Sequence, residues 1–278
     1  MRLRLTIAYD GTPFRGWQSQ PGGRTIQDIL EAAATTILAQ PVSIQGSGRT
    51  DAGVHANGQV AHFDVPDSCR MDPSAWLRAL NVHLPPEIRI MAAAATSPAF
   101  HSRFDAIGKT YRYHLWNAPV LPPLMHNRAW HVPHALDLSL LESATRLLTG
   151  THDFAAFAAF RGDPRSDADT IRTIHSASLS TSGPDISLTW SGNGFLYRMV
   201  RLLTGAAIRV ATGRDSLAWL ESLLLNPAAR KNHHLAPAAG LSLISVAYDP
   251  PATAPLNTSG PVTNNSLPSP AKSQHKAS

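Results

Sequence analysis

Residues 46–55, with the sequence GSGRTDAGVH, organise the rest of this chain. Alternating segments flank this stretch at residues 42–45 and 59–65, so we expect it to join two strands. Its three glycines permit positive φ angles and the close approach of a ligand. Asp51 supplies a carboxylate and Arg49 a guanidinium, and polar loops carried by a rigid scaffold commonly hold active sites. Asp51 can equally form an Asx-turn with nearby backbone amides, and the loop alone does not decide between these interpretations.

Outward from this loop, the first half of the chain predicts the order β-α-β-β-α-β. Thr25, followed by Asp28 three residues later, predicts a capped helix start that resembles a capping box. Asp72 before Pro73 predicts the start of a second helix, because proline suits the first helical position. The predicted strands cover residues 2–10, 42–45, 59–65 and 87–92, and the helices cover residues 26–39 and the segment from Pro73 onward.

The second half repeats this order of elements without repeating the sequence. Asp137 predicts the cap of a helix that ends at Gly150, with Leu138 among the apolar residues that face the core. The other predicted helices cover residues 195–210 and 216–225, and the strands cover residues 109–116, 170–179, 186–190 and 241–248. Two such units predict an α+β fold, in which two ferredoxin-like halves form a largely antiparallel sheet backed by helices.

We therefore expect three parts along the chain. Residues 1–105 form an N-terminal half that carries the Asp51 loop, and residues 106–249 form a C-terminal half. Residues 250–278 are rich in Pro, Ser, Thr and Asn and poor in large apolar residues, which predicts a disordered tail. Residues 162–167 predict a mobile internal loop.

Composition places the chain among globular proteins. Hydrophobic residues make up 43% of its 278 residues and charged residues 15%, which favours a folded core. No apolar run approaches the ~20 residues that span a bilayer, and the N-terminus lacks the apolar region of a signal peptide. Cys69 is the single cysteine, which excludes an internal disulfide and fits a reducing cytoplasm. The net charge of +5 permits an RNA partner without requiring one.

Common cofactor and metal motifs are missing from the sequence. It contains no GxxxxGK[ST], CxxC or HExxH pattern. The closest histidine sets, His131 with His134 and His233 with His234, lack a third ligand at a suitable spacing. Ser47 lacks the context of a nucleophile elbow. We therefore expect that the protein, if it is an enzyme, works without a cofactor or a metal.

A carboxylate beside a cation remains as the candidate for chemistry. An aspartate is ionised at neutral pH, so Asp51 would serve as a nucleophile or a base and not as a general acid. Tyr111, on a predicted strand, either packs in the core or stacks on a nucleic-acid base in a pocket. Arg198 and Arg201 lie on nearby faces of a predicted helix. They are either solvated surface residues or place one guanidinium against Asp51, and the sequence pattern leaves both interpretations open.

Several segments resemble the TruA-type tRNA pseudouridine synthases. They occur in the order of that family and cover roughly residues 3–249. The segments are LTIAYDGTPFRGWQ from residue 5, GRTDAGVHA from residue 48 with GQVAHF after it, FHSRFDAIGKTYRYHLWN from residue 100, GNGFLYRMVRLLTG from residue 192 and APAAGLSLISVAY from residue 236. The resemblance implies the pseudouridine synthase fold. It also implies a homodimer that isomerises uridine to pseudouridine at positions 38–40 of the tRNA anticodon stem-loop.

The resemblance also implies roles for four residues. Asp51 would be the nucleophile, and Arg201 would be its ion-pair partner. Arg49 would help to displace the target base and hold the anticodon arm. Tyr111 would stack on the uracil and assist removal of the C5 proton. Whether Asp51 attacks the ribose or the base stays open.

Other function classes remain to be weighed against this one. Ferredoxin-like sheets often bind RNA without catalysis, although the aromatic RNP1 pattern is absent from the predicted strands. A pseudouridine synthase that acts on other RNA sites would share every motif quoted above. A metal-dependent hydrolase has no supporting ligand spacing.

Overall fold

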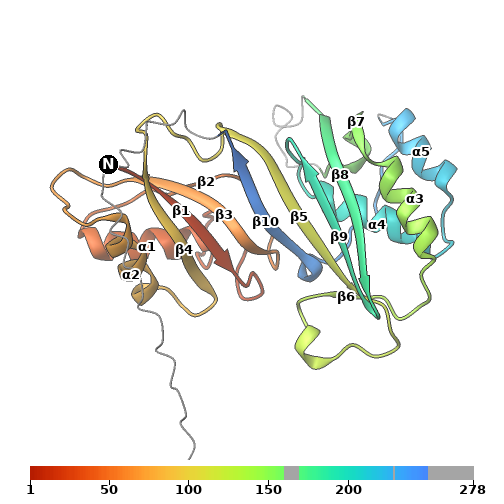
Figure 1. Ribbon diagram of the computed structural model, residues 1–278, viewed down its shortest axis with the longest axis horizontal. Helices are drawn as coiled ribbons and strands as arrows, with labels where there is room; N and C mark the ends of the chain where they lie inside the picture. The colour runs from red at the N-terminus through yellow and green to blue at the C-terminus, as the bar shows by residue number, and fades with distance from the viewer. Residues whose placement is uncertain (160–168, 228, 250–278) are drawn as a thin grey trace, which may run out of the picture.

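The computed structural model describes residues 1–159, 169–227 and 229–249 (Figure 1). The predicted disordered tail over residues 250–278 and the predicted mobile loop at residues 162–167 lie outside the described residues. The helices are α1 (Ile26–Leu38), α2 (Pro73–His83), α3 (Leu138–Leu147), α4 (Met199–Ala211) and α5 (Leu217–Leu225). The strands are β1 (Arg2–Tyr9), β2 (Gln45–Gly46), β3 (His55–Asp64), β4 (Ile88–Thr96), β5 (Ala106–Trp116), β6 (Trp130–His131), β7 (Gly150–Asp153), β8 (Ile171–Ser182), β9 (Asp185–Gly192) and β10 (Leu241–Tyr248).

A single sheet runs through the described part of the molecule in the order β4-β1-β3-β10-β5-β9-β8-β7. We call the elements from β1 to β4 the first unit and those from β5 to β10 the second unit. The main strands of the first unit lie in the order β4-β1-β3-β2, and those of the second unit lie in the order β10-β5-β9-β8. When the four strands of each unit are numbered 1 to 4 along the chain, both orders read 4-1-3-2. This order confirms the predicted pair of ferredoxin-like halves in a largely antiparallel sheet.

The two units join through a short seam between β3 and β10. Ser242 pairs with His55 and Leu243 with Ala56, in parallel. The pairings of the other main strands along the sheet are antiparallel. Helices α1 and α2 back the strands of the first unit, and α3, α4 and α5 lie beside those of the second (Figure 1).

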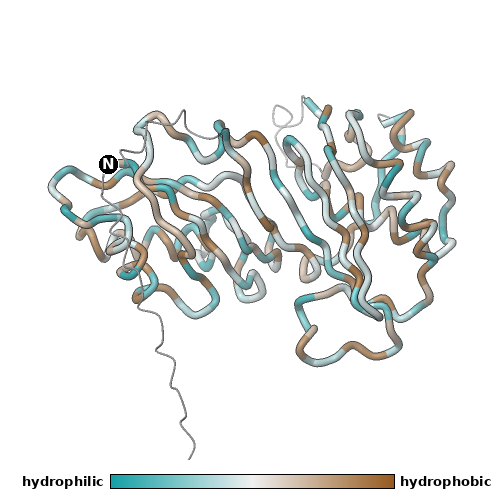
Figure 2. The backbone as a smooth tube through the Cα atoms, in the orientation of Figure 1, coloured by the Kyte–Doolittle hydropathy of each residue, from teal (hydrophilic) through white to brown (hydrophobic). Residues whose placement is uncertain are grey.

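The helix starts follow the predicted caps. Thr25 and Asp28 form a complete capping box at α1, and the Asp72 side chain accepts a hydrogen bond from the Ala75 amide at α2. Along β1, every second residue is buried, which matches the alternation of hydropathy along the strands in Figure 2. These local signals specify the helix starts and the strand periodicity that the sequence predicts.

Three local predictions were wrong. The strand expected at residues 42–45 is reduced to β2, because side chains of α1 bind its backbone: Glu31 accepts the Ile44 amide at 2.9 Å. The helix expected from residue 195 starts at Met199, because Arg198 takes a left-handed conformation with φ 61°. Leu138, expected to face the core, is exposed.

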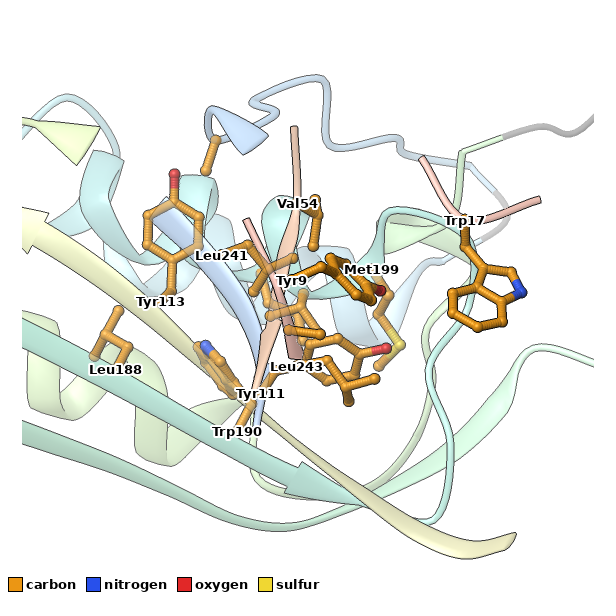
Figure 3. Packing of buried hydrophobic residues seen from close by; sticks show 14 of the residues in the cluster. Tyr9, Trp17, Val54, Tyr111, Tyr113, Leu188, Trp190, Met199, Leu241 and Leu243 are labelled. Atoms are coloured by element: carbon orange, nitrogen blue, oxygen red, sulfur yellow. The ribbon is translucent and has the colours of Figure 1, made fainter. Parts of the chain in front are cut away.

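The core lies between the sheet and the helices and continues across both units. Its largest fully buried side chains include Trp76 on α2 and Trp190 on β9. Near the seam, Tyr9, Tyr111 and Met199 gather from β1, β5 and α4 (Figure 3). Burial of one such side chain contributes about 1.5–3 kcal/mol, so this packing fixes the place where the two units meet.

Candidate active site

A cleft with a volume of about 810 Å³ opens where the two units meet. The 46–54 loop of the first unit and residues 101–104 of the turn between β4 and β5 line it, together with β5 and residues 193–201 of the second unit. Among the described residues that line the cleft, Asp51 is the only carboxylate. The lining side chains with a guanidinium or ammonium group are Arg49, Arg103, Lys109, Arg172, Arg198 and Arg201. A cleft of this charge attracts polyanions.

The Asp51 loop is a tight turn held from both sides. The Val54 amide donates to the Asp51 carbonyl oxygen at 3.1 Å, and Gly53 has a φ of +77° that favours glycine. The Thr50 carbonyl oxygen accepts a hydrogen bond from the Trp17 amide at 3.1 Å. The Thr50 hydroxyl also pairs with the buried hydroxyl of Tyr9 at 2.8 Å. These bonds fix the backbone on which Asp51 stands.

Of the three glycines predicted to allow positive φ, only Gly53 adopts it. Gly46 is needed for space, because a Cβ atom there would overlap the ring of Trp17. A Cβ atom at Gly48 would lie 2.5 Å from the Lys109 ammonium nitrogen. Side chains of the cleft therefore lie close to this loop. The close approach of a ligand stays a prediction.

Asp51 forms an ion pair across the two units. The Arg201 Nη1 atom donates to Asp51 Oδ2 at 2.7 Å, and the two side chains are 12% and 17% exposed. The Arg201 Nε atom donates to the Ala236 carbonyl oxygen at 2.7 Å, which fixes the plane of the guanidinium. Arg198 Nε lies 3.8 Å from the same carboxylate oxygen and is more exposed. The distances answer the question that the helix pattern left open: Arg201 hydrogen-bonds to Asp51, and the more exposed Arg198 lies farther from the same carboxylate.

Tyr111 lies in the wall of the cleft and is 9% exposed. Phe195 contacts it edge to face, with ring centroids 5.2 Å apart. Burial raises the pKa of the Tyr111 hydroxyl, and the nearby Tyr9 and Asp51 raise it further. The phenol therefore stays protonated at neutral pH.

Arg49 lies at the rim of the cleft, two residues before Asp51. Its side chain is exposed, and its Nε atom donates to Gln18 Oε1 at 3.1 Å. The bond leaves the exposed guanidinium facing the same cleft as Asp51. The four residues to which the resemblance assigns roles, Asp51, Arg49, Tyr111 and Arg201, therefore line one cleft.

Two residues that support the Asp51 loop were not predicted from the sequence. Gln59 is fully buried on β3, where its side chain accepts from the Ser47 hydroxyl at 2.7 Å and donates to the Gly48 carbonyl oxygen at 3.0 Å. Lys109 donates to the Ser47 carbonyl oxygen at 2.8 Å. The signal for Gln59 was available, because an amide at an inward position of a predicted strand needs buried partners.

In the described part of the chain, no group of three His, Cys, Asp or Glu side chains is placed to hold a metal ion. None of the helices over the same residues is long and apolar enough to cross a membrane.

The amino-acid sequence matches a known family. A family model described as tRNA pseudouridine synthase matches residues 5–105 and 144–249. The chain belongs to this family. A relative named tRNA pseudouridine synthase A from Akkermansia muciniphila is 49% identical over 89% of this chain and 95% of its own length. Relatives of the same name from Methylacidiphilum infernorum and Bacillus licheniformis are each 41% identical, over 89% and 90% of this chain and 95% and 100% of their own lengths.

Proposed function

We propose that this protein isomerises uridine to pseudouridine in the anticodon stem-loop of tRNA, at positions 38–40, with Asp51 as the nucleophile. The ion pair between Asp51 and Arg201 at the floor of a cationic cleft is the observation that carries this proposal. The family and the names of the relatives support tRNA as the substrate.

The reaction requires one nucleophile and a site that holds the substrate in a fixed geometry. The C1′–N1 bond breaks, a C1′–C5 bond forms, C5 loses a proton and N1 gains one, so no redox partner or group donor enters the balance. Arg201 orients the Asp51 carboxylate, because the guanidinium is itself held by the Ala236 carbonyl oxygen. The cleft must then hold the detached base while it turns, which is a task of orientation.

We assign Tyr111 to stacking on the uracil. Its ring already packs against Phe195, and its raised pKa favours a neutral phenol over a phenolate that would remove the C5 proton. Arg49 is assigned to displacement of the target base and to the anticodon arm, since it stands exposed at the rim.

The cationic lining suits a structured RNA, which proteins recognise mainly through its shape and its backbone. We further propose that the protein acts as a homodimer in the cytoplasm and uses no cofactor. Sedimentation equilibrium of the full chain tests the dimer, which a mass of one chain would contradict.

Tritium release from tRNA labelled at uridine C5 tests the reaction. We expect release by the wild type in the presence of EDTA, and a loss of at least about 10³-fold in Asp51→Asn, as for removal of a nucleophile. Asp185→Asn is the matched control, because Asp185 pairs with His114 outside the cleft, and its release should equal that of the wild type. Release by Asp51→Asn at the wild-type rate would remove Asp51 from its role.

The position of the modified uridines is tested on the same reactions. Mass mapping of the product should locate pseudouridine at positions 38–40. Pseudouridine elsewhere in the RNA would favour the same chemistry on another target. Bound tRNA without any tritium release would favour an RNA-binding protein.

A further inference from the structure

The turn between β4 and β5 holds a phenyl ring in solvent at the edge of the cleft. Phe104 is 74% exposed, yet it lines the same cleft as Asp51. Single exposed apolar side chains are common on protein surfaces, so exposure alone says little. The hydrogen bonds that hold this turn in place are the stronger evidence for a role of Phe104.

Three strands anchor the residue at the centre of the turn. Ser102 is fully buried, and its hydroxyl donates to the Gln45 carbonyl oxygen of β2 at 2.7 Å. Its amide donates to His62 Nδ1 of β3 at 3.2 Å, and its carbonyl oxygen accepts from the Tyr248 hydroxyl of β10 at 2.6 Å. The hydrogen bonds of Ser102 therefore restrict the backbone of the turn that carries the exposed Phe104 ring.

A histidine ring supports Phe104 from within the turn. His101 Nδ1 accepts the amides of Arg103 and Phe104 at 3.1 and 3.3 Å, so the proton lies on Nε2, which donates to Gln45 Oε1 at 2.8 Å. The His101 and Phe104 ring centroids are 4.2 Å apart, and the planes are tilted by 35°. The Arg103 guanidinium lies 5.6 Å from the Phe104 centroid. We call His101, Arg103 and Phe104 the rim stack.

We propose that the rim stack binds an unpaired base of the RNA substrate, which stacks on Phe104 while Arg103 contacts a neighbouring phosphate. This inference rests on the proposed function and adds a binding subsite to it. Aromatic and guanidinium planes are the groups on which unpaired RNA bases stack. A rigid ring loses little conformational entropy on binding, so most of the stacking free energy remains as affinity. The cationic lining of the cleft favours RNA over a second copy of this chain, whose net charge is also positive.

Binding of labelled tRNA to the full-length protein tests the rim stack. We expect Phe104→Ala to raise the Kd by about 5- to 150-fold, the range of a lost base–aromatic stack, and Phe104→Tyr to restore it. The matched control is Val82→Ala, which removes an apolar side chain that is 80% exposed on α2 and does not line the cleft. Its Kd should equal that of the wild type.

Salt dependence separates the two parts of the rim stack. Phe104→Ala should leave the slope of log Kd against log salt unchanged, whereas Arg103→Ala should reduce it by about 0.7–1, as for one lost phosphate contact. In turnover, Phe104→Ala should raise KM and leave kcat near the wild-type value, as expected for a binding subsite.

Two results would overturn the inference. One is an unchanged Kd and KM in Phe104→Ala. The other is a change in the oligomeric mass of Phe104→Ala, which would assign the ring to a contact between chains. Because Kd is measured without turnover, failure of wild-type tritium release would reject the proposed reaction and still leave the rim stack testable.

Discussion

The two units of the sheet share one strand order and differ at one equivalent connection. In the second unit, β8 is a strand of 12 residues that turns into β9 through Gly183 and Pro184. In the first unit, β2 has 2 residues, and the connection to β3 is the loop that carries Asp51. A shortened strand thus provides the length of chain from which the candidate active site is made.

The shortening also makes the seam between the units possible. β2 covers β3 only at Ala61 and His62, while β10 pairs with the same strand at His55 and Ala56. A β2 strand as long as β8 would occupy that edge and exclude β10. The short β2 therefore leaves chain for the Asp51 loop and leaves part of the β3 edge free to pair with β10. This pairing joins the two units and places Arg201 beside Asp51.

The largest effect should follow from breaking the ion pair that crosses the units. We expect Arg201→Lys to reduce single-turnover tritium release by about 10²–10³-fold, because one ammonium cannot serve both the Ala236 carbonyl oxygen and Asp51 in the fixed geometry of a guanidinium. Arg209→Lys is the matched control, since Arg209 lies on the same helix and pairs with Asp215 outside the Asp51 cleft. Equal rates for both variants would show that the guanidinium geometry is dispensable.

A smaller effect should follow from crowding the seam. A Cβ atom at Gly58 on β3 would overlap the Ile244 carbonyl oxygen of β10, so we expect Gly58→Ala to lower the free energy of unfolding by about 1–3 kcal/mol in urea titrations. Gly108→Ala is the comparison on β5, where the nearest atom to a new Cβ would be the Gly192 carbonyl oxygen at 3.4 Å. A loss in Gly108→Ala as large as that in Gly58→Ala would contradict a special role for the seam.

A third effect concerns pH and separates the two units. Burial, with the nearby His101 and Arg2, lowers the pKa of His62 to about 4. Neutral His62 accepts the Ser102 amide, so its contribution to stability is complete above about pH 6.5 and is lost as the pH falls toward about 4. We expect a loss of about 2 kcal/mol over this window, weaker in His62→Gln.

Hydrogen exchange locates this loss of stability. Protection factors of β3 amides, which are corrected for the intrinsic pH dependence of exchange, should be lower at pH 5 than at pH 7, and those of β9 should change less. Equal changes in both strands would place the acid sensitivity elsewhere.

Most elements of this fold could be predicted from local signals. The capping box at Thr25 and the alternation along β1 are properties of a few neighbouring residues, and the structure confirms both. The strand at residues 42–45 could not be excluded locally, because Glu31 binds the Ile44 amide from a helix earlier in the chain. The start of α4 depends on the left-handed Arg198, a conformation that no pattern of side chains indicates.

Some residues of the candidate site could also be predicted from local sequence, and others could not. The carboxylate of Asp51 in a glycine-rich loop is a local feature, and the resemblance of GRTDAGVHA to the synthase family singled it out as the candidate nucleophile. The choice between Arg198 and Arg201 required the distance across the seam, and the bond from Arg201 to Ala236 joins residues 35 positions apart. Gln59 was visible in principle as a polar residue in an apolar strand, and only its partners reveal that it braces the loop.

The late position of β10 in the chain has a consequence for synthesis. Asp51 leaves the ribosome early, while Arg201 follows 150 residues later and β10, which closes the seam, comes at residues 241–248. The segment that delivers β10 also carries the Ala236 carbonyl oxygen that orients Arg201. A chain that stops before Ala236 therefore lacks both the carbonyl oxygen that orients Arg201 and the strand that joins the two units.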